Sequence, residues 1–428
     1  MGRVAVILTW MSLLVAGWGS PTAYGARAAA GVPQELASQP GPSFVSAFDK
    51  TPDRVWIGPE YWANPLQDWR VAGGALECAK AAPNRSLILL TRELSARLEP
   101  FSSSIAIAPW PAGSERAASA WLGFRIAARG RFGDYRDDAV YGEGIDAGMR
   151  ADGSLFIGDS SNAGVGDAAT IRQLRIALVE AGGGWQLRLS TIGPDERVRA
   201  TTVLPIADPR DLRGAIGVVC QDVACRVNEW RVEGPKVDAR DEHAFGPILF
   251  TQYTVSGSIL KLTAQMPPIG PRDVQEVRLA VPGTAGRLDG GTAAAWREIA
   301  RATIDPLART ATFRVANWDD GRDQTYRVLY AVTDAGGVVR DAIFDGTIRR
   351  DRGAEAQTVV AAFTGNNDLG FPHADVVRHV STFKPDLLVF TGDQIYEPVG
   401  GFGVQRSPLD MAALDYLRKW YICRKRET

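Results

Sequence analysis

Two short polar segments near the end of the chain carry side chains that could do chemistry. Residues 364–370 have the sequence Thr-Gly-Asn-Asn-Asp-Leu-Gly, and residues 391–397 have the sequence Thr-Gly-Asp-Gln-Ile-Tyr-Glu. Oxygen donors of this kind suit hard or borderline cations such as Ca, Mn or ferric iron. The same residue types are also ordinary turn and helix-cap residues after a strand. The two segments therefore predict either a metal site or simple loop chemistry.

The elements around these segments favour convergence on one point. Each polar segment follows a continuous apolar run, residues 358–363 and 387–390, as is typical of parallel strands buried on both faces. Between the runs, residues 372–383 repeat apolar side chains at helical spacing. This is the pattern of a βαβ unit, in which ligands gather outside the carboxyl ends of the strands. The predicted metal ligands are Asn366, Asp368, Asp393 and Tyr396.

The second segment resembles a known family signature. A strand followed by Gly392-Asp393-x-x-Tyr396 is similar to the motif of the alkaline phosphatase D (PhoD-like) metallophosphoesterases and the purple acid phosphatases, in the calcineurin-like superfamily. The resemblance implies that Asp393 bridges two metals in the catalytic site and that Tyr396 binds iron as a phenolate. It implies two metal ions, Fe(III) with Ca, Mn or Zn. The implied reaction is hydrolysis of phosphate mono- or diesters by metal-activated hydroxide.

The chain departs from this family pattern in two ways. Residues 366–368 are Asn-Asn-Asp, where many members have Asp-x-His and PhoD-like members have a cysteine. The family also needs a downstream Asn-His motif and further histidines as ligands, but every histidine of this chain precedes Asp393. The histidines are His243, His373 and His379.

The C-terminal segment is also short for a phosphoesterase. Residues 398–428 are too few for the second half of a four-layer α/β domain. We therefore expect an incomplete metallophosphoesterase domain over residues 357–428, from a truncated or frameshifted reading frame. The sheet should leave a hydrophobic face open, and the chain should have little or no activity. Whether the chain is an enzyme is left open.

Upstream of this segment the pattern predicts a multidomain, mainly β protein. Over residues 44–237, short apolar runs alternate with glycine-rich turns, a pattern that resembles the concanavalin-like jelly-roll sandwiches found beside secreted hydrolases. Residues 246–350 predict a second sandwich of fibronectin or immunoglobulin type. The 45 glycines and 12 tryptophans suit such β-rich architecture, because turns need glycine and half-buried faces take aromatics.

The N-terminus has the layout of a secretory signal peptide. A short positive start precedes an apolar run, and small residues suited to cleavage follow, so we assign the signal to residues 1–28 and a linker to 29–43. The run is shorter than the roughly 20 residues that span a bilayer. We expect a mature chain without a transmembrane segment, exported to the periplasm or outside the cell.

The charge balance and the cysteines limit the partners. Lys and Arg number 48 and Asp and Glu 49, so the net charge of −1 gives no electrostatic reason to expect nucleic acid. Cys220 and Cys225 flank a four-residue segment and form either a local disulfide that closes a turn between strands or two thiols. An exported chain favours the disulfide.

A second function class competes with the phosphatase. The chain could be a non-catalytic secreted protein whose sandwiches bind a glycan or a surface. Four aromatic residues of the first sandwich could stack on sugar rings or belong to the core. They are Trp56, Tyr61, Trp62 and Trp69.

An acidic loop of the same sandwich has two interpretations. It could hold calcium, because carboxylates cluster there, or it could be a solvated loop. Its acidic residues are Asp134, Asp137, Asp138, Glu143 and Asp146.

Overall fold

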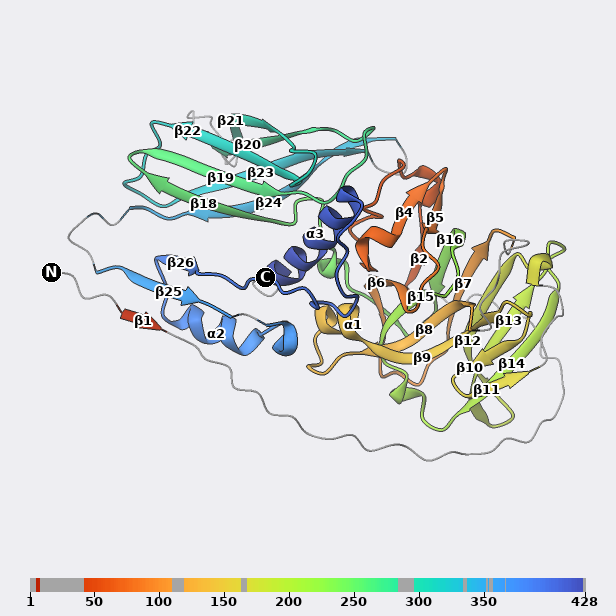
Figure 1. Cartoon of the computed structure of the whole chain (residues 1–428). Helices are drawn as coiled ribbons and strands as arrows, with labels where there is room; N and C mark the ends of the chain where they lie inside the picture. The colour runs from red at the N-terminus through yellow and green to blue at the C-terminus, as the bar shows by residue number, and fades with distance from the viewer. Residues whose placement is uncertain are drawn as a thin grey trace, which may run out of the picture.

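The computed structural model is mainly β, as the sequence predicts (Figure 1). It describes residues 5–7, 42–109, 119–162, 168–283, 296–333, 337–351, 353, 357–365 and 367–425. Two antiparallel sandwiches follow one another along the chain. A small parallel sheet and a long helix form the C-terminal part.

The first sandwich has two antiparallel sheets. The first sheet runs in the order β11 (Ser160–Asn162), β10 (Leu155–Ile157), β9 (Glu143–Arg150), β8 (Trp121–Arg129), β15 (Gly214–Gln221), β6 (Arg85–Leu94) and β17 (Val237–Ala239), with β3 (Tyr61–Asn64) also paired to β6. The second runs in the order β14 (Val198–Ile206), β13 (Gly184–Ile192), β12 (Gln173–Ala181), β7 (Phe101–Ile107), β16 (Cys225–Glu233), β5 (Ala75–Cys78) and β4 (Trp69–Ala72), with β2 (Ser43–Val45) paired to β16.

The core of this sandwich lies between its two sheets. Alternating residues point inward along each strand, for example Leu187 and Leu189 on β13, which have no exposed surface. Trp230 on β16 is likewise fully buried. Gly123 on β8 faces Gly148 on β9, and a Cβ at Gly123 would lie 2.0 Å from the carbonyl oxygen of Ala147. Only glycine fits at this close approach.

The second sandwich has a separate core. One sheet contains β18 (Phe250–Ser256), β19 (Ile259–Gln265) and β22 (Thr310–Ala316). The other runs in the order β21 (Trp296–Thr303), β20 (Glu276–Pro282), β23 (Gln324–Thr333) and β24 (Val339–Ile348). Leu262, Leu279 and Phe313 lie in its interior. The boundaries given for the two sandwiches stay predictions.

The C-terminal part begins with the predicted βαβ arrangement. β25 (Val359–Phe363) pairs in parallel with β26 (Leu387–Phe390), and α2 (Ala374–Thr382) connects them. β1 (Ala5–Ile7), from the predicted signal peptide, pairs in parallel with the other edge of β25. The rest of residues 1–28 and of the linker up to residue 41 lies outside the described residues.

The prediction that these strands are buried on both faces is wrong. Leu387 and Leu388 of β26 are each 48% exposed, and Phe383 beside them is 45% exposed. The expected open hydrophobic face is therefore present. Within the described part of the chain this sheet has three strands, and it does not show a metallophosphoesterase domain.

The last helix, α3 (Leu409–Lys425), lies where the two sandwiches meet (Figure 1). Tyr421 packs with residues of the first sandwich, and its hydroxyl donates to the carbonyl oxygen of Met266 in the second. The charged residues at its end, Arg424 and Lys425, are buried as well. They stay helical because the surrounding protein buries them.

The remaining elements are short. The helix α1 (Tyr135–Tyr141) packs against β8 of the first sandwich. Single 3₁₀ turns are η1 (Phe48–Lys50), η2 (Leu66–Asp68), η3 (Ala168–Thr170), η4 (Pro209–Asp211), η5 (Asp241–His243) and η6 (Asp368–Gly370). In the described residues, no helix is both long and apolar enough to cross a bilayer.

Candidate functional site

The structure brings two of the predicted metal ligands together. The Tyr396 hydroxyl donates to Oδ2 of Asp393 at 3.0 Å. A Cβ added to Gly365, just after β25, would lie 3.9 Å from the same hydroxyl, so the ends of the two strands do meet. The hydrogen bond to Asp393 raises the pKa of Tyr396, because the neutral phenol is the donor.

Asp368 makes a different contact. Its Oδ2 accepts hydrogen bonds from the Tyr141 hydroxyl and, at 3.1 Å, from the backbone N–H of Gly400. Tyr141 ends α1 of the first sandwich, and its pKa is raised, first by burial and then by this carboxylate. Asp368 therefore fastens the C-terminal part to the first sandwich. Asn366 lies outside the described residues.

The two-metal centre has no support in the described part of the chain. No group of three or more His, Cys, Asp or Glu side chains there could hold a metal ion. His373 is engaged locally, with Nε2 2.6 Å from the carbonyl oxygen of Asn367.

The aromatic cluster of the first sandwich belongs to the core. Trp69 is 1% exposed and Trp62 is 5% exposed, and Trp56 and Tyr61 are buried as well. The indole N–H groups of Trp62 and Trp69 donate to the side chain and the carbonyl oxygen of Asn64. Of the two interpretations of this cluster, the burial of the rings supports the core and not sugar stacking.

Four of the five acidic residues of the loop have protein partners, whereas Glu143 is exposed. Asp134 caps α1 and pairs with Arg136. The other three are Asp137, which accepts from the N–H of Phe132, Asp138, which accepts from the N–H of Gly130, and Asp146, which pairs with Arg125 through both oxygens. Burial raises the pKa of Asp138 to about 6. These carboxylates hold the loop and helix in place.

A cavity of about 310 Å³ opens beside the disulfide of the first sandwich. The β4–β5 hairpin, the start of β16 and the end of β7 surround it. Its lining residues are Arg70, Glu77, Cys78, Ala79, Ala108, Pro109, Leu122, Val223, Ala224, Cys225 and Arg226. The lining is therefore mainly apolar, with three charged side chains.

The charged side chains of this cavity form one network. Glu77 accepts from Nε of Arg70 at 2.8 Å with one oxygen and from Nη1 of Arg226 at 2.5 Å with the other. Arg226 also donates to the carbonyl oxygen of Gly73 at 2.8 Å. The side chains of Arg70 and Arg226 remain 53% and 37% exposed. They are held in position and still present N–H groups to solvent.

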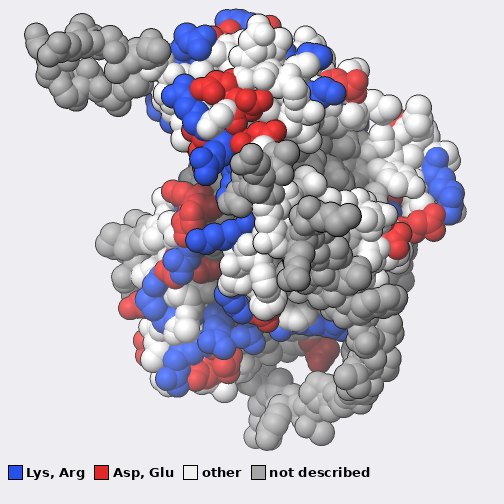
Figure 2. Space-filling model, turned by 90° about the vertical axis from the view of Figure 1, so that its left-hand side faces the viewer, with Lys and Arg blue, Asp and Glu red and all other residues white. Residues whose placement is uncertain are grey.

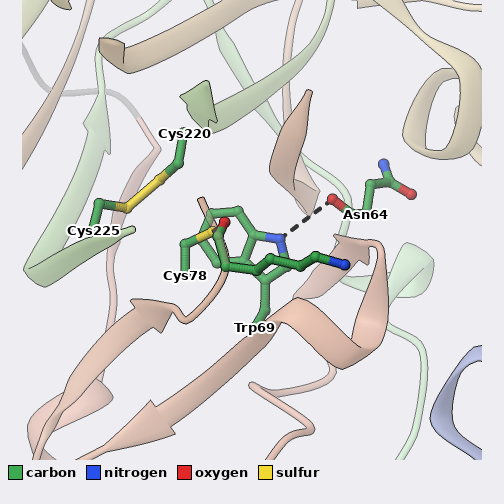
Figure 3. Close-up of a disulfide and its surroundings, with 6 residues drawn as sticks. Asn64, Trp69, Cys78, Cys220 and Cys225 are labelled. Carbon is green, nitrogen blue, oxygen red and sulfur yellow. Dashed lines mark hydrogen bonds between the residues drawn. A yellow bond between two sulfur atoms is a disulfide. The ribbon is translucent and has the colours of Figure 1, made fainter. Parts of the chain in front are cut away.

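In the sequence analysis, the cysteines were the one signal near this cavity. Cys220 and Cys225 form the favoured disulfide, which links β15 to β16 (Figure 3). Arg70, Glu77 and Arg226 were missed because a charged residue on a strand is the ordinary sign of a solvated face. Their convergence depends on strand pairing, which places Glu77 opposite both arginines.

A second cavity, beside the aromatic cluster of the first sandwich, is too small for a sugar. It holds about 30 Å³, room for about one or two waters, and lies among Trp56, Trp62, Leu249 and Tyr421 where α3 meets the first sandwich. On the face shown in Figure 2, basic and acidic side chains are interspersed. Among the residues described on this face, neither sign forms one large area.

Comparison with known proteins gives a fold likeness only. No protein-family model matches the chain, and no curated protein matches it in sequence. Among solved structures, basic winged bean lectin with Tn-antigen matches with 9% identity and a TM-score of 0.32, over 45% of this chain and 98% of the lectin.

Two further solved structures are similar to a comparable extent. The potassium-bound carbohydrate recognition domain of Emp46p has 13% identity and a TM-score of 0.26, over 41% of this chain and 88% of its own. The calcium-bound exoplasmic/lumenal domain of VIP36 has 9% identity and a TM-score of 0.27, over 40% of this chain and 82% of the VIP36 domain. Each of these matches covers less than half of this chain.

These findings correct the family prediction. The PhoD-like resemblance rested on one short motif, and no metallophosphoesterase family model matches the chain. The prediction of a metallophosphatase acting on phosphoesters is therefore wrong.

Proposed function

We propose that the chain is a non-catalytic glycan-binding protein whose ligand lies in the cavity beside the Cys220–Cys225 disulfide. The observation that carries this proposal is the convergence of Arg70, Glu77 and Arg226 on an open space of about 310 Å³. Binding pockets start at roughly 300 Å³, so a single sugar ring suits this volume.

The polar groups suit a sugar. A guanidinium offers N–H donors in a fixed planar fork, which matches neighbouring hydroxyls or a carboxylate. Both oxygens of Glu77 accept hydrogen bonds from the two arginines. Two arginines and one carboxylate give the cavity an excess of positive charge. We therefore expect an acidic sugar, such as a uronic acid, to bind more tightly than a neutral one.

Binding without hydrolysis follows from the same lining. Glycoside hydrolysis generally needs a pair of carboxyl groups on either side of the scissile bond. Among the described residues of the lining, Glu77 is the one carboxylate, and both of its oxygens are engaged by arginines. These residues can hold a sugar but lack the acid and base to cleave it.

Export from the cytoplasm belongs to the same proposal. Disulfides persist in oxidising compartments outside the cytoplasm, and Cys220–Cys225 is such a bond. Residues 1–28 have the pattern of a signal peptide. The ligand would then be a periplasmic or extracellular glycan.

A glycan array followed by calorimetry tests the proposal. The array should show binding to saccharides that contain uronic acids. Arg226→Ala should then weaken binding about 10- to 100-fold, the range expected when a charged hydrogen-bonding partner is lost. Arg231→Ala is the matched control, because Arg231 lies on the same strand and pairs with Glu229 instead. An array without signal, or equal affinity of Arg226→Ala and the unmodified chain, would contradict the proposal.

A further inference from the structure

Three cysteines meet at the base of the cavity. Cys220 on β15 is bonded to Cys225 on β16, with their Cα atoms 6.6 Å apart. Cys78 on β5 is the direct partner of Cys225 in the antiparallel ladder between β5 and β16. On the other side of β5, Cys78 pairs with Trp69. Figure 3 shows Cys78 between the disulfide and the Trp69 ring.

Cys225 is within bonding reach of either neighbour. Directly opposed residues of an antiparallel pair have Cα atoms roughly 4.5–5.5 Å apart. Disulfides form at Cα separations of roughly 4.4–6.8 Å. The backbone therefore permits a Cys78–Cys225 bond as well as the observed Cys220–Cys225 bond.

Access from solvent distinguishes the two sulfurs of the disulfide. Cys225 and Cys78 both line the cavity, whereas Cys220 does not and has no exposed surface. A small thiol that enters the cavity meets the sulfur of Cys225. Cys220 is then the leaving group.

We propose that Cys78, Cys220 and Cys225 form a thiol–disulfide exchange site served by a low-molecular-weight thiol. The thiolate of the small molecule attacks Sγ of Cys225, and the S–S bond to Cys220 breaks. Cys220 leaves as a thiolate and takes up a proton. Cys78 then loses its proton, attacks Sγ of Cys225 and releases the small thiolate. The net result is a Cys78–Cys225 disulfide and a Cys220 thiol, with no net oxidation or reduction.

The surroundings of Cys78 make its attack on Cys225 the slow step of the exchange. Its S–H donates to the carbonyl oxygen of Lys80 at 3.5 Å, and burial raises the pKa of the thiol to about 12. At neutral pH Cys78 is protonated, so its attack on Sγ of Cys225 is slow. The exchange should accelerate about tenfold per pH unit in this range, since the thiolate fraction rises by that factor.

The exchange changes which parts of the sandwich are cross-linked. β15 and β16 belong to different sheets, so Cys220–Cys225 joins the two layers. β5 and β16 are neighbours in one sheet, so Cys78–Cys225 would join strands within a layer. The site rests on the cysteines and the cavity, and it holds whether or not the cavity binds a glycan.

Disulfide mapping by mass spectrometry tests this site. The full chain is incubated with millimolar reduced glutathione, quenched with iodoacetamide and digested with a protease that cleaves before aspartate. Cleavage before Asp222 separates Cys220 from Cys225. The expected products are a cross-linked Cys78–Cys225 peptide and alkylated Cys220, in amounts that grow with pH.

Two variants sharpen the result. Cys78→Ser should stop the exchange at a glutathione adduct on Cys225, and Cys423→Ala, which removes the cysteine of α3, should leave the exchange unchanged. If Cys78→Ser does not fold, the disulfide mapping of the unmodified chain still shows whether the Cys78–Cys225 bond forms. Glutathione on Cys220, or loss of the disulfide without any Cys78–Cys225 peptide, would overturn the proposal.

Discussion

The C-terminal part and the first sandwich both carry conspicuous charged residues, but they use them differently. In the C-terminal part, Asp368 and the charges of α3 are engaged by the surrounding protein. In the first sandwich, Arg70 and Arg226 are held at the edge of an open cavity. Residue type determines which interactions a side chain can make, and only free space beside it allows a ligand to take part.

Several charged side chains of α3 are engaged by the surrounding protein. Asp415 and Lys419 form an ion pair of 2.6 Å, with side chains 1% and 2% exposed. Arg418 donates to the carbonyl oxygens of Val399 and Gly400. Lys425 lies over the rings of Trp62, Tyr135 and Phe245, at 4.9, 5.3 and 4.7 Å. These contacts engage the charged side chains of the helix with the surrounding protein.

The largest effect should follow from Asp415→Ala. This change leaves Lys419 buried without its counter-charge and also removes the acceptor for Gln67 of the first sandwich. We expect a loss of about 3–5 kcal/mol in the unfolding free energy, as for other broken buried ion pairs. Urea unfolding measures it. Asp410→Ala in the exposed first turn of the same helix is the control and should change little.

A smaller effect should follow from Tyr141→Phe. It removes the hydroxyl that donates to Asp368 and accepts from the N–H of Gly400. Loss of a hydrogen bond to a charged group costs about 1.5–3 kcal/mol, and limited proteolysis should cut the C-terminal part faster. Tyr416→Phe, at a position 51% exposed, should leave both measurements unchanged. Equal behaviour of the two variants would contradict the role given to Asp368.

The titration of Lys425 should change the unfolding free energy less than either substitution above. Burial, with a contribution from Arg136, lowers the pKa of Lys425 to about 7, whereas the unfolded chain keeps it near 10.5. Between these values the unfolded state binds more protons, so stability should rise with pH, by about 1 kcal/mol from pH 7 to 8. Below about pH 7 this contribution should be flat. Lys425→Met should abolish the dependence, and a rise that persists in this variant would assign it to another group.

Much of the fold could be predicted from local patterns. Alternating strands indicated the two sandwiches, the apolar runs and the helical stripe indicated β25, α2 and β26, and the spacing of Cys220 and Cys225 indicated their disulfide. Each of these signals lies within a short stretch of sequence, where local physics dominates.

The functional residues depended on distant partners. The partner of Asp368 is Tyr141, 227 positions away, and Glu77 meets Arg226 only after β5 pairs with β16. The motif around Asp393 and Tyr396 resembled a metal site because its residue types match one. Whether Trp69 is a sugar platform or core is decided by the sheets that cover it, and its sequence neighbours do not reveal them.

Hydrogen exchange with and without an acidic saccharide tests the central difference between the two regions most directly. If the cavity binds the ligand, backbone amides of residues 70–78 and 223–226 should exchange more slowly in its presence, and those of residues 393–396 should be unaffected. Asp393→Asn should leave this pattern intact. Protection at residues 393–396 without protection at the cavity would contradict the account.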